Sequence, residues 1–173
     1  MPTHKVFLNG PLGGGKTETI KSVSDLPLVS VLKKLAVTQT AVSLDYGRVH
    51  IDSRMIYLYA PAQGTLEDRE WLSVANQTDG LVYVVDGATT ELRAALTLFE
   101  DLVSVWHGPT VVGINGVGRS DYSERVYSRF TESFGSEFAI VPYSAVRKTS
   151  SFSLFRIVAD LFDAKDLASQ TGD

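Results

Sequence analysis

The sequence predicts a single α/β domain in which helices cover both faces of a six-stranded, mostly parallel sheet with one antiparallel edge strand. Short apolar runs alternate along the chain with longer segments whose apolar residues recur at helical spacing, and this alternation is typical of parallel sheets. Two expected strands, 41–51 and 55–59, are separated only by a tight turn and predict a β-hairpin. The residues from Gly10 to Thr17 fit the pattern GxxxxGK[ST] and join the first strand to the first helix.

The N-terminal third of the chain begins with an apolar strand at 4–9. A helix is expected at 17–24, and it is short because Pro27 follows and the residue before a proline disfavours helical backbone. The segment 28–39 has no clear period and predicts an irregular connection. In 41–51 apolar and polar residues alternate, as in a strand with one solvated face.

The rest of the chain repeats a helix-then-strand pattern. A helix is expected at 66–78, where early acidic residues suit the helix dipole, and the continuous apolar run 81–86 is typical of a central parallel strand. An apolar stripe predicts a helix over 89–106. The remaining strands are expected at 109–115 and 138–141, and the remaining helices at 121–134 and 152–162.

Composition excludes several classes of function. The chain has 173 residues, which suits one domain, expected over 1–165 with a flexible tail over 166–173. The net charge is −4 and no run of lysine and arginine occurs, so nucleic acid is not an expected partner. The absence of cysteine excludes disulfides and lipid anchors on cysteine, and no apolar stretch is long enough to span a membrane. We therefore expect a cytoplasmic protein without an intrinsic membrane anchor.

The glycine-rich stretch predicts a phosphate-binding loop. Such a loop turns successive backbone N–H groups inward at a helix N-terminus, where anions are favoured. Gly10 and Gly15 permit the turns, Lys16 would reach the β- and γ-phosphates of a nucleotide, and the Thr17 hydroxyl would ligate Mg²⁺. The candidate nucleotide-binding residues of the loop are Gly10, Gly13, Gly14, Gly15, Lys16 and Thr17.

With this loop and this order of elements, the chain resembles a Ras-like small GTPase from Lys5 to Phe162. Within that superfamily it is similar to the bacterial branch that includes MglA and the GTPases encoded beside roadblock-type proteins. The stretches that carry this likeness are 40–48, Glu70-Trp71 and 81–86. The resemblance implies a P-loop NTPase fold and a molecular switch that binds GTP or GDP with Mg²⁺.

The chain departs from the family's second-switch motif, Asp-x-x-Gly-Gln, which contacts the Mg²⁺ site and the γ-phosphate and orients the attacking water. Alignment on the motif places Ala60 at the aspartate, and Gln63 and Gly64 reverse the Gly-Gln order. Gln63 is the candidate catalytic residue that orients the water. The alternative is that Gln63 is an ordinary polar loop residue.

The family's base-specificity motif, Asn-Lys-x-Asp, is only partly kept. Asn115 matches, but the lysine and the aspartate that pairs with guanine are absent from the sequence that follows it, Gly116-Val117-Gly118. This loss should weaken discrimination in favour of guanine. Asp121 either substitutes for the aspartate or caps the helix that follows. Ser144 and Ala145 match the family's Ser-Ala loop beside the base.

Besides the loop threonine, the family's Mg²⁺ site uses a threonine of the first switch. Thr40 is the candidate here, and Thr38 is the second choice. Waters and phosphate oxygens would complete the octahedron. Asp45 is expected to pair with Arg48 or water, and Asp86 to cap a turn, so neither is assigned to the metal.

Two functions of different classes remain. The first is a GTPase-like switch with slow intrinsic hydrolysis, read out through a regulatory or effector protein, for which a roadblock-type GTPase-activating protein is the candidate. The second is a binding or scaffold module that has kept the fold and lost turnover.

Overall fold

The computed structural model describes residues 1–34, 39, 41–62 and 68–172, with the backbone alone described at 68 and 69. Its strands are β1 (Thr3–Asn9), β2 (Val29–Lys34), β3 (Ala41–Ile51), β4 (Arg54–Pro61), β5 (Gly80–Asp86), β6 (Thr110–Asn115) and β7 (Ala139–Tyr143). Its helices are α1 (Lys16–Val23), α2 (Asp68–Ala75), α3 (Leu92–Val105), α4 (Glu124–Phe134) and α5 (Lys148–Gln170).

The strands form one sheet in the order β2-β3-β4-β1-β5-β6-β7. The five strands from β4 to β7 run parallel, whereas β3 is antiparallel to β4 and β2 is antiparallel to β3. The expected α/β class and the hairpin are confirmed. The number of strands is seven rather than six, because part of the segment expected to be irregular forms β2.

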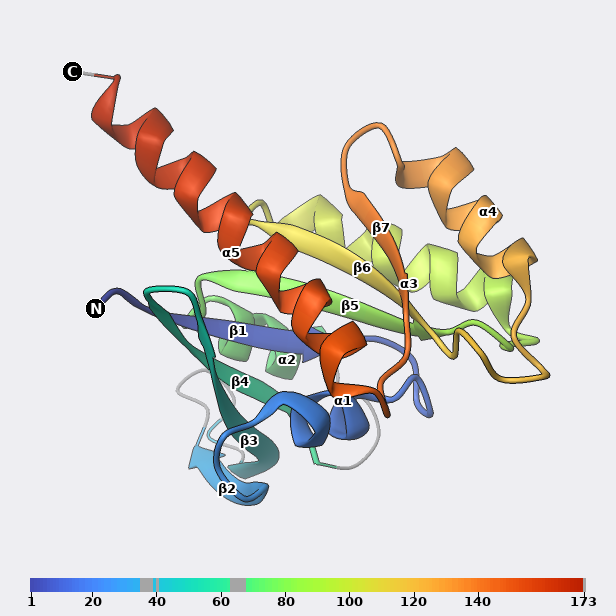
Figure 1. The fold of residues 1–173 in the computed structure, drawn as a ribbon, viewed down its shortest axis with the longest axis horizontal. Coiled ribbons are helices and arrows are strands. Elements are labelled where there is room, and N and C mark those ends of the chain that lie inside the picture. The colour runs from blue at the N-terminus through green and yellow to red at the C-terminus, as the bar shows by residue number, and fades with distance from the viewer. Residues whose placement is uncertain (35–38, 40, 63–67, 173) are drawn as a thin grey trace.

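Helices cover both faces of the sheet (Figure 1). On one face α1 and α5 pack over a core that contains Val6, Leu8 and Leu58. On the other face α2, α3 and α4 pack over a core that contains Phe7, Tyr83 and Val85. Consecutive residues of β1 therefore enter opposite cores, as the two-residue period of a strand requires.

Two element ends differ from the sequence prediction. Helix α5 continues eight residues past Phe162, although every described residue after Phe162 is exposed. An apolar stripe reports only the buried part of a helix, so the pattern missed these solvated turns. Helix α4 begins at Glu124 and is capped by Ser123, whose side chain accepts a hydrogen bond from the Arg125 backbone N–H, so Asp121 is not the cap. Within the described residues, no helix combines the length and the apolar character needed to cross a membrane.

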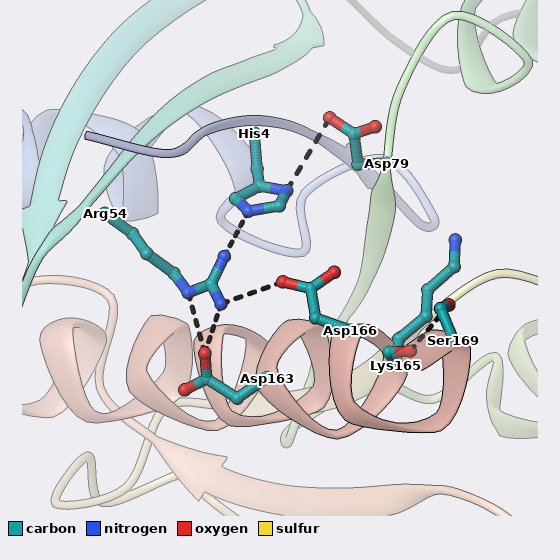
Figure 2. Close-up of polar contacts among 7 residues, drawn as sticks. All are labelled: His4, Arg54, Asp79, Asp163, Lys165, Asp166 and Ser169. Atoms are coloured by element: carbon teal, nitrogen blue, oxygen red, sulfur yellow. Dashed lines mark hydrogen bonds and ion pairs between the residues drawn. The ribbon is translucent and has the colours of Figure 1, made fainter. Parts of the chain in front are cut away.

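Arg54, at the start of β4, joins the hairpin to the outer part of α5 (Figure 2). Its Nε donates to Asp163 Oδ1 at 3.0 Å and its Nη2 to Asp166 Oδ2 at 3.1 Å. The Arg54 side chain is nearly buried, whereas both aspartates are more than half exposed. The Arg54 side chain is therefore buried between the sheet and α5, while its guanidinium pairs with acidic groups of the helix.

His4 lies beside this cluster and makes folding stability depend on pH. Its ring stacks on Phe162 with centroids 4.1 Å apart, contacts Arg54 and lies 4.0 Å from Asp79. Burial, followed by the nearby Arg54 charge, lowers the pKa of His4 below its usual value of about 6.5. The unfolded chain thus binds this proton more tightly, so stability falls as the pH drops through that range. We expect His4→Gln to flatten the fall of the unfolding free energy between about pH 7.5 and 5.5.

The matched control for this substitution is His107→Gln, because His107 is an exposed histidine. Urea unfolding at each pH measures the effect. Equal slopes for the wild type and both variants would show that other groups carry the pH dependence.

Candidate functional site

The predicted phosphate loop lies between the carboxyl end of β1 and the start of α1. Gly10, Gly13 and Gly15 have φ values of 143°, 79° and 100°, which other residues rarely adopt. A Cβ atom on Gly10 would lie 2.1 Å from the Val84 carbonyl oxygen, so the loop passes directly against β5. Glycine is required here for both backbone angle and space, as the sequence predicted.

The loop borders a cavity of about 480 Å³ lined by residues 12–18 together with Pro61 and Ala62 at the end of β4. Lys16 is 6% exposed, and its Nζ donates to the carbonyl oxygens of Gly10 at 2.8 Å and Pro11 at 3.0 Å. Burial lowers the pKa of Lys16 to about 8, so the ammonium is still mostly protonated at neutral pH. A buried cation whose hydrogen-bond partners among the described residues are two carbonyl groups is suited to receive a polyanion.

A buried carboxylate also stands beside the loop. Asp45 of β3 is 4% exposed, and its Oδ2 accepts a hydrogen bond from the Thr17 hydroxyl at 2.6 Å. Its Oδ1 accepts from the Ser30 hydroxyl of β2 at 2.8 Å. The expected pair with Arg48 is wrong, because Arg48 Nε donates instead to Asp25 at 2.9 Å.

Asp45 and Thr17 together fit a magnesium site. Asp45 lies directly opposite Ala60 in the β3–β4 register, and Ala60 stands where the family resemblance placed the second-switch aspartate. The Asp45 carboxylate therefore lies on β3, one strand away from the family's aspartate position on β4, and it still contacts the Thr17 hydroxyl of the loop. Hydroxyl and carboxylate oxygens are the ligands that Mg²⁺ prefers. Among the described residues, no group of three or more histidine, aspartate or glutamate side chains is arranged to hold a metal ion.

Asn115, at the end of β6, connects the phosphate loop to the loop after β7. Its Nδ2 donates to the Gly14 carbonyl at 3.0 Å, and its Oδ1 accepts from the Ala145 backbone N–H at 2.8 Å. The neighbouring Ser144 is buried, and its backbone N–H donates to the Ser150 hydroxyl at 2.8 Å. The structure thus brings Asn115, Ser144 and Ala145 together beside the phosphate loop.

Other predicted residues have different outcomes. Gln63, Gly64, Thr38 and Thr40 lie outside the described residues. Asp86 caps a turn as expected, since its Oδ1 accepts from the Ala88 backbone N–H at 3.0 Å.

The place of Asp45 beside the phosphate loop was not predicted from the sequence. The hairpin turn at 52–53 fixes the pairing of the two strands, and counting back from it places Asp45 opposite Ala60. That register was the signal that could have found the carboxylate.

No protein-family model matches the sequence, and no curated protein matches it. Among solved structures, the chain is similar to the G domain of the T. maritima FeoB iron transporter, with a TM-score of 0.70 and 15% sequence identity. The match covers 92% of this chain and 99% of that one. The chain therefore has the fold of a P-loop GTPase G domain.

Proposed function

We propose that this protein is a nucleotide-binding switch of the GTPase type, which holds nucleoside di- and triphosphates, GTP and GDP among them, together with Mg²⁺. The observation that carries this proposal is the buried Lys16 in a glycine cradle, beside a cavity large enough for a polyphosphate. The G-domain fold supports it, because phosphates in this class of sheet bind beyond the carboxyl ends of the strands.

The loop binds phosphate through groups that are already in place. The Lys16 ammonium exchanges its carbonyl partners for phosphate oxygens, which are stronger acceptors for a charged donor. The N-terminus of α1 has no side-chain cap, so its backbone N–H groups are available to an anion. The Lys16 ammonium and the helix N-terminus both contact phosphate groups, so neither distinguishes one base from another.

Thr17 and Asp45 would hold Mg²⁺, directly or through water. When bound, the ion neutralises charge on the β- and γ-phosphates. The Thr17 hydroxyl can donate its hydrogen bond to Asp45 and still offer the lone pairs of its oxygen to a cation. Ser30 fixes the other carboxylate oxygen and so orients the group. A first-switch ligand at Thr40 and a water-orienting role for Gln63 stay predictions.

Turnover should be slow, because Ala60 replaces an acidic residue of the second-switch motif and the Gly-Gln order is reversed. Signalling would then depend on a partner that binds the switch segments, and a roadblock-type GTPase-activating protein stays the predicted candidate. The likeness to the MglA-like bacterial branch and a cytoplasmic location also stay predictions. The similar G domain belongs to an iron transporter, as its description states.

Single-turnover hydrolysis of bound GTP with Mg²⁺ tests the switch against the scaffold alternative. We expect loss of the γ-phosphate at on the order of 10⁻⁴ s⁻¹ or slower, as in switches that lack their activating partner. The control is the same nucleotide in buffer with Lys16→Ala protein. A rate equal to that control, with tight binding retained by the wild type, would establish the scaffold module instead.

A further inference from the structure

The loops after β6 and β7 form one unit beside the phosphate loop. The backbone N–H groups of Gly116 and Val117 both donate to the Tyr143 carbonyl, at 2.9 and 3.2 Å. Asn115 joins the same unit to the backbone N–H of Ala145. By the family resemblance, the base of a bound nucleotide lies against these loops, so their side chains decide which base is accepted.

Arg119 covers the position where the family motif carries its lysine. A Cβ atom on Gly116 would lie 2.9 Å from the Arg119 Cζ, so the guanidinium lies over that glycine. Arg119 Nε donates to Asp121 Oδ1 at 3.0 Å, and Nη2 also contacts Asp86. The flat guanidinium, held from two sides, offers a surface on which an aromatic ring can stack.

The Arg147 guanidinium lies beside Gly118, the position at which the family motif carries its aspartate. Its Nη2 lies 3.3 Å from the position of a Cβ atom on Gly118. The φ of Gly118 is +91°, which an aspartate would adopt only with strain. Two carboxylates reach this region, Asp86 and Asp121, and both accept from Arg119. The side chain beside Gly118 is thus a guanidinium, which can only donate hydrogen bonds.

We propose that this subsite reads the base with arginine donors in place of a carboxylate acceptor. It therefore takes purine nucleotides whose edge offers acceptors, adenine above all, at least as well as guanine. The inference rests on the proposed nucleotide site and specifies the class of nucleotide that the site takes.

The chemistry of the bases supports this assignment. Guanine presents the N1–H and N2–H₂ donors to the place of the missing aspartate, where they would face Arg147, and mismatched donors at a polar site lower affinity. Adenine presents N1, an acceptor, at the same edge. The Ala145 N–H, which would contact a base carbonyl by the family resemblance, is already bonded to Asn115 at 2.8 Å. The amino group of adenine therefore meets no competing free donor at that point.

Competition binding tests the proposal. ATP, XTP and GTP, each with Mg²⁺, are titrated against a fluorescent nucleoside triphosphate on the full chain, with inorganic tripolyphosphate as a base-free probe. We expect ATP and XTP, which carries a carbonyl in place of the guanine amino group, to bind at least as tightly as GTP. GTP binding more than about tenfold tighter than ATP overturns the proposal and leaves the nucleotide switch intact. Failure of all three nucleotides and of tripolyphosphate overturns both.

Two variants separate reading of the base edge from a structural role. Arg147→Ala should shift the ATP-to-GTP affinity ratio about tenfold towards GTP, because it removes the donor. The side chain of Arg147 makes no capping hydrogen bond to α5, so the helix keeps its start. Arg156→Ala is the matched control, since Arg156 is an exposed arginine of α5 and pairs with Asp52. An unchanged ratio in Arg147→Ala overturns the assignment of this residue.

Discussion

Replacing Lys16 by alanine is expected to weaken binding of a magnesium–nucleoside triphosphate by roughly 100-fold or more. The Lys16 ammonium is the buried cation of the phosphate cradle, and its present partners are two backbone carbonyls that phosphate oxygens would replace. Truncation removes a charge-assisted contact and leaves the glycines of the loop unchanged. Isothermal titration calorimetry with a non-hydrolysable triphosphate measures the loss.

The same side chain gives a second readout. The pKa of Lys16 is about 8 in the free protein because of burial, and a bound polyphosphate favours the charged form. The complex therefore holds this proton more tightly than the free protein, so triphosphate affinity should decline as the pH rises above about 8. Lys16→Ala should lose that decline.

Lys21→Ala is the control for both readouts, because Lys21 is an exposed lysine on the same helix. It should bind triphosphate as the wild type does. If Lys16→Ala keeps wild-type affinity and is still folded, the glycine-rich loop is not a phosphate site and the proposed function fails.

The parts of the fold that follow from periodicity and from the loop motif could be predicted from sequence. Buried runs such as 81–86 and the alternation in 41–51 reflect burial that side chains enforce, and both became strands close to the expected bounds. The phosphate loop was predictable because its backbone geometry requires glycine, as the close approach of Gly10 to Val84 shows. Local requirements of this kind leave a direct mark on the residues.

What escaped prediction depends on groups that meet across the sheet. Strand β2 is held by its backbone ladder to β3 and has mostly exposed side chains, so no hydrophobic period marks it. The contact of Asp45 with Thr17 joins residues 28 positions apart and needs β3 and α1 in place at once. Arg119 over Gly116 likewise depends on how a short loop folds back. None of these contacts has a local pattern.

Replacing Asp45 by asparagine is expected to reduce by about tenfold or more the gain in triphosphate affinity that Mg²⁺ provides. Asparagine has the same shape and keeps an acceptor for the Thr17 hydroxyl, but it lacks the charge that a hard cation requires. Without Mg²⁺, the affinity should stay equal or rise, because a negative charge beside the phosphates is gone. Calorimetry in EDTA and in Mg²⁺ measures both values, and neither depends on hydrolysis.

Ser30→Ala separates the charge of Asp45 from its anchoring hydrogen bonds. This variant removes one neutral donor to the carboxylate and leaves the charge, so the Mg²⁺ gain should persist while the unfolding free energy drops by about 1 kcal/mol. Asp25→Asn is a further control, because Asp25 is a carboxylate paired with Arg48 and His50. A full Mg²⁺ gain in Asp45→Asn would mean that the carboxylate only anchors β2 and the loop threonine. Loss of the Mg²⁺-dependent affinity gain in Asp45→Asn, but not in Ser30→Ala or Asp25→Asn, would mean that β3 supplies the acidic group that β4 lacks at Ala60.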